Sequence, residues 1–380
     1  MRLAISLLNL RPGRVGGAET YVRKLVAELP RVAEPGDSLV AIMDREVAAA
    51  LDTPGWERVM VDRSARRIVA ERILEAFTPY RALGVERVFR GVGADVVLFP
   101  QQSIFPKRAP GRVVMTAVDV QHLFHPEQVP LLERLYRRAI YPASMARADH
   151  LVAISHFTRR TLIGRCGIPP ERVTAIPLGY DGRGASDVVP TDRVSGAYLL
   201  YPAATFAHKN HAELIRSYAA LRRRGDLDAK LVLTGMQTPT WKGLARLARD
   251  LGVGKDVVHL GYLPYPELRR VFAGAEAVVF PSRYEGFGIP VVEAALEFGK
   301  KVITSRLPVF DEIGVPAERQ IDFADPGALL AALRLPGPTV LASPPEPWTE
   351  CARRTYDVLR APARPGATGV GHLDSAGGAR

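Results

Sequence analysis

The sequence predicts an α/β protein built from two Rossmann-like, doubly wound domains that face each other across a central cleft. The chain has 380 residues, which is enough for two domains of ordinary size. Short apolar runs alternate with amphipathic stretches in two successive blocks, a pattern typical of parallel sheets covered by helices on both faces. A stretch over 182–196, rich in Gly, Asp, Ser and Pro and without an apolar period, separates the blocks.

The first block predicts a domain over residues 1–182. Its apolar runs predict buried strands, and the amphipathic stretches between them predict helices. Ser155 follows one of these runs and is a residue type that caps helix N-termini, so we expect a helix directly after it. Strands are expected at 3–8, 38–43, 96–99, 113–118 and 150–154, and helices at 19–29, 68–77 and 157–163.

The second block predicts a linker at 183–196 and a second domain over 197–345. A last amphipathic run at 348–359 predicts one more helix, within an element spanning 346–360. The tail at 361–380 holds many Gly, Ala and Pro without an apolar period, so we expect it to be disordered. In the second domain, strands are expected at 198–201, 230–234, 257–260, 277–280 and 301–304, and helices at 211–223, 268–273 and 290–298.

The composition indicates the cellular compartment of the protein more clearly than it indicates the binding partners. The formal net charge of +11 favours anionic partners, whether nucleic acid, acidic lipid or phosphorylated small molecules, and an arginine bias of the composition would also produce it. The two cysteines show neither metal-type spacing nor a disulfide framework, which favours a reducing cytoplasm. No apolar run reaches about 18 residues, so no membrane span is predicted, and residues 1–10 are interpreted as a strand rather than a signal peptide.

The segment from 281 to 293 is the strongest candidate for a binding site. A predicted strand is followed by a loop that contains Gly286 and Gly288 and then by a helix with Pro290 near its first turn. Loop amides and a helix N-terminus together attract anions, and glycine lets a ligand approach the backbone closely. Glu285 and Glu293 lie eight residues apart, so they can point into one pocket at different depths, where carboxylates suit sugar hydroxyls. The alternative is a glycine turn with two solvated acids.

Lys209 and a pair of glycines are further candidates. Lys209 follows a predicted strand and precedes a helix, where its charge suits a diphosphate, although a solvated lysine is the commoner case. Gly16 and Gly17 follow the first strand without a G-x-G-x-x-G pattern, which argues against a dinucleotide-dependent oxidoreductase. The one Asp-x-Asp, Asp226 to Asp228, lies in a polar turn and is interpreted as a solvated loop rather than a metal site.

Several segments, in this order along the chain, resemble the motifs of retaining GT-B glycosyltransferases of family 4 (glycosyl transferases group 1). The most specific is Glu285-x7-Glu293 with Gly-Phe-Gly-Ile-Pro inside it, and the resemblance extends over roughly residues 1–360. The other matching segments are Gly16-Gly17-Ala18-Glu19, Ser155-His156-Phe157-Thr158, Ile176-Pro177-Leu178-Gly179-Tyr180-Asp181, His208-Lys209-Asn210-His211 and Val309-Phe310-Asp311-Glu312-Ile313.

The resemblance implies a metal-independent hexosyltransferase without a cofactor, which uses a nucleotide diphosphate sugar as its donor and retains the anomeric configuration. The donor is expected on the second domain and the acceptor on the first, with the last helix crossing back. Glu285 would hold sugar hydroxyls, Glu293 the ribose or part of the sugar, and Leu263 the base through its backbone. The full set of implied donor-binding residues is Gly16, Gly17, Lys209, Leu263, Glu285, Gly286, Phe287, Gly288, Ile289 and Glu293.

Two departures from the family pattern affect the expected chemistry. The family usually places a histidine directly before the aspartate at the end of one strand, and this chain has Val118 before Asp119. His122 and His125 follow on the same loop and could supply an imidazole, and the alternative for His122 is a packing residue. The implied catalytic set is Glu285, Asp119 and His122. The family also often has an arginine shortly before the lysine, whereas residues 202–206 contain no cation.

The acceptor remains open among a glycan, a lipid-linked glycan and a small molecule, and no nucleic acid partner is expected. Two groups of arginines in the first domain could contact an anionic membrane, so a cytoplasmic protein peripheral to the inner face of the cell membrane is one interpretation, and a solvated helix face is the other. A nucleotide-sugar epimerase on the same fold and a non-catalytic nucleotide-sugar-binding protein are the alternative functions. The arginines are Arg63, Arg66, Arg67, Arg72, Arg134, Arg137 and Arg138.

Overall fold

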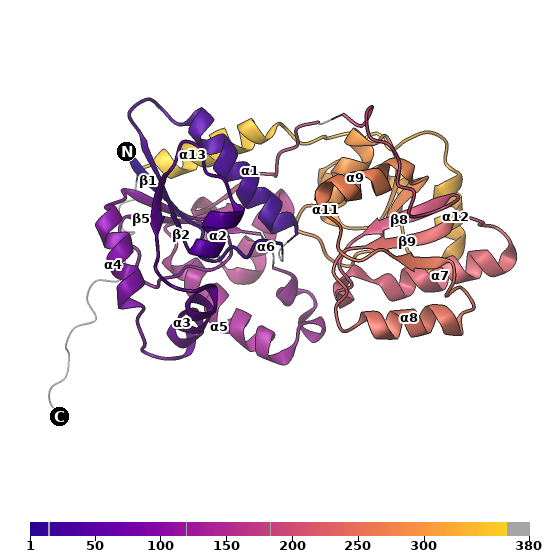
Figure 1. Cartoon of the computed structure of the whole chain (residues 1–380), viewed down its shortest axis with the longest axis horizontal. Helices are drawn as coiled ribbons and strands as arrows, with labels where there is room; N and C mark the ends of the chain where they lie inside the picture. Colours follow the sequence, from indigo (N-terminus) through magenta and orange to yellow (C-terminus); the bar gives the residue numbers. More distant parts are fainter. Residues whose placement is uncertain (14–15, 119, 183, 363–380) are drawn as a thin grey trace.

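The computed structural model describes residues 1–13, 16–118, 120–182 and 184–362, which form two α/β domains side by side (Figure 1). Each domain has one parallel sheet with helices packed against it. The strands are short runs of buried apolar residues, as expected where both faces of a sheet are covered. The α/β fold with two doubly wound domains, predicted from the alternating pattern, is confirmed.

The N-terminal sheet has seven strands in the order β3-β2-β1-β4-β5-β6-β7. Its strands are β1 (Arg2–Ser6), β2 (Ser38–Met43), β3 (Glu57–Met60), β4 (Val96–Phe99), β5 (Arg112–Ala117), β6 (His150–Ala153) and β7 (Val173–Ala175). The helices between them are α1 (Gly17–Val32), α2 (Arg45–Ala50), α3 (Ala65–Phe77), α4 (Leu83–Val92), α5 (Leu131–Arg147) and α6 (His156–Cys166).

The C-terminal sheet has six strands in the order β10-β9-β8-β11-β12-β13. Its strands are β8 (Tyr198–Pro202), β9 (Lys230–Thr234), β10 (Val257–His259), β11 (Ala277–Phe280), β12 (Lys301–Ser305) and β13 (Gln320–Ile321). The helices of this domain are α7 (His211–Arg224), α8 (Trp241–Asp250), α9 (Tyr265–Gly274), α10 (Ile289–Val292), α11 (Pro308–Glu312) and α12 (Pro326–Arg334), and they are followed in the chain by α13 (Trp348–Arg360).

Short 3₁₀ turns and one π-helix complete the structure. The helix expected over 290–298 is wrong in one respect, because α10 gives way to a π-helix at Glu293–Glu297 (η5), whose wider turn starts at a candidate site residue. The 3₁₀ turns are η1 (Gln121–Leu123), η2 (Pro126–Gln128), η3 (Pro170–Arg172), η4 (Ala207–Lys209) and η6 (Ala317–Arg319).

The chain passes between the domains twice. The expected boundaries at 182 and 197 fall between β7 and β8, and the described residues between them contain no helix or strand. After α12 the chain returns, and α13 lies on the N-terminal domain beside α1 (Figure 1). There the ring of Trp348 packs 6.4 Å from that of Tyr21, and Thr349 donates a hydrogen bond to Glu28. Among the described residues, no helix is long and apolar enough to cross a membrane.

Candidate active site

The candidate site lies at the carboxyl ends of two neighbouring strands of the C-terminal sheet, β8 and β11. The loop after β8 carries Lys209 at the end of η4, and the loop after β11 carries Glu285. Because both strands run parallel, these loops emerge at the same edge of the sheet, where open α/β sheets bind ligands. Lys209 Nζ lies 2.7 Å from Glu285 Oε1, and the two side chains are only 19% and 11% exposed.

A hydrogen bond from the side chain of Tyr201 holds the backbone at Lys209. The Tyr201 hydroxyl donates a hydrogen bond to the carbonyl of Lys209 at 2.8 Å. The backbone N–H of Arg283 donates a hydrogen bond to the carbonyl of His208. Burial, together with the nearby Glu285 carboxylate, raises the pKa of Tyr201, so its phenol stays protonated and remains a donor. The bond between Arg283 and His208 joins the loop after β8 to the loop after β11.

The structure shows why the loop after β11 contains Gly286 and Gly288. Gly288 has a φ of 105°, a left-handed conformation that favours glycine, and it directly precedes α10. A Cβ on Gly286 would lie 2.6 Å from the carbonyl oxygen of Val118 in the other domain, so only glycine fits there. The buried ring of Phe287 belongs to the same core as Leu263, which lies before α9.

Glu293 lies on the buried side of the same loop-helix segment. It is the first residue of the π-helix and is 9% exposed. The hydroxyl of Tyr265 donates a hydrogen bond to Glu293 Oε1 at 3.0 Å. One turn later, Glu297 accepts bonds from Arg269 and from Tyr180, which stands at the exit from the N-terminal domain. The second carboxylate of the motif is therefore oriented by α9.

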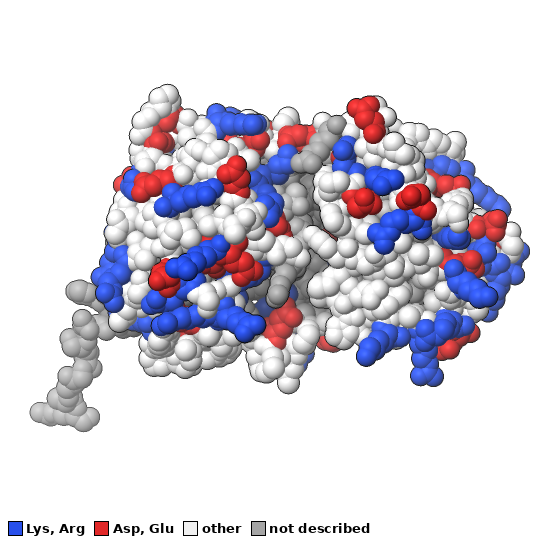
Figure 2. All heavy atoms as spheres, in the orientation of Figure 1, with Lys and Arg blue, Asp and Glu red and all other residues white. Residues whose placement is uncertain are grey.

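The N-terminal domain contributes its own glycine loop to the cleft. A Cβ on Gly17 would lie 3.6 Å from Ile289 Cδ1, so the start of α1 packs on the start of α10. Gly16 caps α1 with a φ of 53°. The structure thus brings Gly17 to the start of α10 at Ile289, and Figure 2 shows a furrow between the two domains.

His122 is a buried neutral imidazole. It is 7% exposed, and its ring packs edge-on against Tyr141 of α5 with centroids 5.1 Å apart. Burial, together with the charge of Arg137, lowers the pKa of His122 to about 4. The predicted partner Asp119 lies outside the described residues, so the roles of Asp119 and His122 stay predictions.

A cation of the N-terminal domain, Arg137, acts on the residue that precedes Lys209. His208 precedes it, and burial, then Lys209 and Arg137, lower the pKa of His208 to about 3, so this ring is neutral. Arg137 belongs to α5 of the N-terminal domain and also lowers the pKa of His122. An anion in this region would meet cationic groups from both sides of the cleft.

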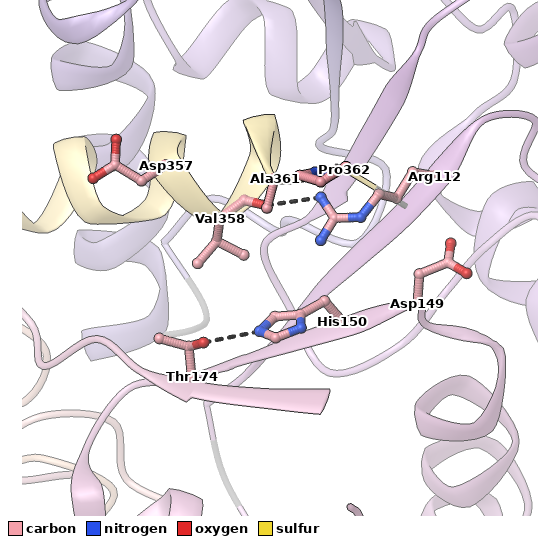
Figure 3. A pocket seen from close by; sticks show the side chains of 8 residues that line it. All are labelled: Arg112, Asp149, His150, Thr174, Asp357, Val358, Ala361 and Pro362. Atoms are coloured by element: carbon pink, nitrogen blue, oxygen red, sulfur yellow. Dashed lines mark hydrogen bonds between the residues drawn. The ribbon is translucent and has the colours of Figure 1, made fainter. Parts of the chain in front are cut away.

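A separate hollow of about 260 Å³ lies where α13 ends against the N-terminal sheet (Figure 3). Arg112 donates to the carbonyl of Val358 there, and His150 lies 2.9 Å from the hydroxyl of Thr174. Arg112 and His150 are the first residues of β5 and β6. The hollow is therefore at the amino ends of these strands, opposite to the edge where such sheets bind ligands.

Sequence reasoning missed the residues that hold the site together, namely Tyr201, Tyr265, Tyr284 and Glu312. Tyr265, Tyr284 and Glu312 act through partners that are distant along the chain, such as Tyr265 on Glu293, whereas Lys209 is only 8 residues from Tyr201. For the three tyrosines the available signal was a polar group next to a predicted strand or motif, because buried tyrosines generally find a partner for their hydroxyl. Glu312 lies in the matching segment 309–313, which did not indicate a role for it.

Two family models match successive parts of the chain. The model described as Glycosyltransferase Family 4 matches residues 15–182, and the model described as Glycosyl transferases group 1 matches residues 191–334. Together they cover the greater part of both domains.

Two curated relatives indicate the range of the sequence similarity. An O-antigen chain mannosyltransferase of Salmonella typhimurium is 26% identical over 199 residues, which is 52% of this chain and 53% of the relative. An MMP alpha-(1->4)-mannosyltransferase of Mycolicibacterium hassiacum is 30% identical over 212 residues, 54% of this chain and 49% of the relative. The chain thus spans about half the length of the curated relatives it matches.

Solved structures extend the similarity of the fold to nearly the whole chain. WaaG, a glycosyltransferase involved in lipopolysaccharide biosynthesis, aligns with a TM-score of 0.61 at 19% identity, over 94% of this chain and 96% of that one. Anabaena HepE, solved in complex with UDP and glucose, aligns with a TM-score of 0.61 at 17% identity, over 94% and 99%. The chain belongs to the glycosyltransferases of group 1 and family 4 and has their GT-B fold.

Proposed function

We propose that this protein transfers a hexose from a nucleotide diphosphate sugar to a glycan, lipid-linked or small-molecule acceptor, with retention of configuration and without a metal. The observation that carries the proposal is the pair Lys209 and Glu285 beside the glycine loop at the carboxyl edge of the C-terminal sheet. The family of the chain supports the reaction class.

The proposed chemistry follows from the charges in the site. Cleavage of the anomeric C–O bond leaves a diphosphate and an oxocarbenium-like sugar. Lys209 and the amides at the start of α10 would stabilise the diphosphate electrostatically, while Glu285 binds sugar hydroxyls. The acceptor oxygen would attack from the face that the diphosphate leaves, and its proton would pass to a phosphate oxygen of the leaving group. Donor binding would thus give Lys209 a new anionic partner in addition to Glu285.

Mannose is the hexose that we propose to test first. Both relatives named above are called mannosyltransferases, whereas the solved Anabaena structure holds UDP and glucose. The decisive experiment is a thermal-shift panel of GDP-mannose, UDP-glucose and UDP-N-acetylglucosamine against wild type, Lys209→Ala and the control Lys242→Ala, an exposed lysine in α8. A donor that binds only the folded state raises the melting temperature.

We expect one donor to raise the melting temperature of the wild type and of Lys242→Ala but not of Lys209→Ala. That donor should then be consumed on addition of acceptor. A shift that survives in Lys209→Ala would remove Lys209 from the site. Conversion of the donor without any acceptor would favour an epimerase, and donor binding without turnover or hydrolysis a binding protein.

A lipid-linked acceptor would place the protein at a membrane surface. Helices α3 and α5 form a face of the protein that could contact such a membrane. These helices lie side by side at one end of the N-terminal domain (Figure 1), joined by Arg72 over the ring of Tyr136. Both acids of α3, Glu71 and Glu75, are buried, so its outer side is basic and apolar. The exposed apolar residues of this face are Ile73, Leu74, Phe77, Leu131, Leu132 and Leu135.

Sedimentation with lipid vesicles tests this face. Leu132 is 81% exposed, and apolar side chains flanked by arginine favour the interface of an anionic bilayer. We expect wild type and the control Val340→Glu, which changes an exposed residue of the C-terminal domain, to bind phosphatidylglycerol vesicles, and Leu132→Glu to bind weakly. If Leu132→Glu binds as well as wild type, or if wild type binds neutral vesicles as well as phosphatidylglycerol vesicles, the face is a solvated helix surface and not a membrane contact.

A further inference from the structure

Glu312 makes a direct, two-pronged contact between the domains. It ends α11 in the C-terminal domain, and its carboxylate accepts hydrogen bonds from two backbone N–H groups of α6 in the N-terminal domain. His156 N lies 2.7 Å from Oε1 and Phe157 N lies 2.9 Å from Oε2. Both oxygens of one side chain are thus used across the cleft.

The start of α6 is open to such a partner because its own residues leave these amides unpaired. The first N–H groups of a helix have no partner within the helix. Ser155 accepts a bond from Thr158 N at 3.0 Å, and the first turn of α6 contains no acidic residue of its own. A carboxylate at this position gains charge-assisted hydrogen bonds and the favourable end of the helix dipole.

The contact is adjacent to the donor loop. The ring of Phe157 packs 6.0 Å from that of Tyr284, and both pack against Phe124. The hydroxyl of Tyr284 accepts a bond from Val120 N at 3.1 Å, and Tyr284 directly precedes Glu285. The contact of Glu312 holds the start of α6, and the contact of Tyr284 holds Val120. Both contacts therefore lie beside the loop that carries Glu285.

We propose that Glu312 is a positioning residue, a latch that holds the cleft closed by capping α6 from the opposite domain. The latch fixes the distance between the acceptor domain and the Tyr284–Glu285 segment, so it acts on the reaction through that segment and not by contact with substrate. This role rests on the proposed glycosyl transfer only for its catalytic consequence. The closure itself is a property of the two domains.

Amide hydrogen exchange tests the latch independently of activity. Glu312→Gln keeps the shape of the side chain but turns one acceptor into an N–H₂ donor that faces a backbone N–H. The matched control is Glu318→Gln, an exposed residue of the same domain. We expect peptides covering the start of α6 to exchange about tenfold faster in Glu312→Gln, as for the loss of one charge-assisted bond, and X-ray scattering to show a larger radius of gyration. Glu318→Gln should match wild type.

Kinetics test the catalytic consequence. With the donor identified, Glu312→Gln should lower kcat about tenfold, equivalent to about 1.4 kcal/mol, while the Kd of the donor and the melting temperature stay near those of wild type. Tyr284→Phe, which removes the bond from Val120, should lower kcat as well, and the double variant should lose less than the product of the two.

The outcomes separate the two proposals. Faster exchange at α6 without any glycosyl transfer in the wild type would leave the latch standing and overturn the proposed function. Unchanged exchange and an unchanged radius of gyration in Glu312→Gln overturn the latch, whatever the enzyme does. A lower kcat accompanied by a large fall in melting temperature, with exchange raised throughout α6, assigns Glu312 a merely structural role.

Discussion

The two domains have the same architecture but differ in how the chain builds them. The C-terminal sheet and its helices come from one continuous stretch, from β8 to α12. The N-terminal domain is completed by α13, which is separated from the rest of it by the whole second domain. The candidate site repeats this contrast, because Lys209 and Glu285 follow adjacent strands of one sheet, whereas the part of the cleft on the N-terminal domain combines loops from several segments.

The difference shows which features a local pattern can encode. A continuous strand-loop-helix segment such as 277–293 carries its own geometry in its residue order. The contact between the domains depends on pairs such as Tyr284 with Val120 and Glu312 with α6, which no local spacing in the sequence indicates. Variants can therefore test the two domains separately.

The largest effect is expected where the N-terminal domain depends on the end of the chain. Trp348 is 4% exposed and packs on Tyr21, so Trp348→Ala should lower the free energy of unfolding by about 3–5 kcal/mol. Urea denaturation followed by far-UV circular dichroism measures this loss. Arg353→Ala on the exposed side of α13 should change it by less than about 0.5 kcal/mol. A loss below 1 kcal/mol in Trp348→Ala would make α13 an accessory to this domain.

The next effect concerns the self-contained site of the C-terminal domain. Lys209→Ala and Glu285→Ala should each lower kcat/KM by about 100-fold or more, equivalent to about 2.7 kcal/mol. Each removes one member of a mostly buried ion pair that we propose contacts the donor. Steady-state kinetics with the identified donor provide the measurement, and Lys242→Ala serves as the control. Near-normal turnover in both variants is incompatible with the proposed site.

A smaller effect is expected where the domains touch. Gly286→Ala adds a methyl group 2.6 Å from the carbonyl oxygen of Val118, so the loop after β11 must move away from the N-terminal domain. We expect kcat to fall about tenfold, about 1.4 kcal/mol. A Cβ on Gly243 in α8 meets nothing within 4 Å, so Gly243→Ala should leave kcat unchanged. Equal rates for both variants would show that the contact of Gly286 with Val118 is not needed for turnover.

The smallest effect is a pH dependence of stability in the C-terminal domain. Burial lowers the pKa of His211 to about 3, against about 6.5 in the unfolded chain. The unfolded state therefore binds the proton first, and stability present above pH 6.5 is lost as the pH falls toward 3. We expect roughly 1 kcal/mol of this loss between pH 6.5 and 5.5. Urea titrations of wild type and His211→Gln isolate the contribution, and superimposable pH profiles would contradict it.

Much of the fold was predictable because most strands are apolar runs with clear ends. Ser155 was recognised as a helix cap from its position, and its hydroxyl does accept the N–H of Thr158. β3 escaped prediction because its residues, from Glu57 to Met60, are mostly exposed at a sheet edge and show no apolar run. α5 escaped because Leu131, Leu132 and Leu135 face solvent, so its pattern does not indicate a core-facing helix.

The candidate site was predictable only as far as its motifs are continuous. The structure places Lys209 against Glu285, which the spacing of the two motifs does not specify. The π-helix at Glu293 and the bond from Tyr265 depend on packing between α9 and the segment 281–293, so no periodicity in the sequence indicates them. Asp119 lies outside the described residues, and the catalytic assignment of that strand end remains a prediction.

The return of α13 to the first domain has a consequence for the order in which the protein matures. During synthesis on the ribosome, domains generally fold as units in N- to C-terminal order. Here the seven strands of the first sheet emerge before residue 176, yet the helix that covers Tyr21 begins only at Trp348. The first domain to be translated is therefore the last to be completed, and the side of it that α13 covers stays open until the whole second domain has been synthesised.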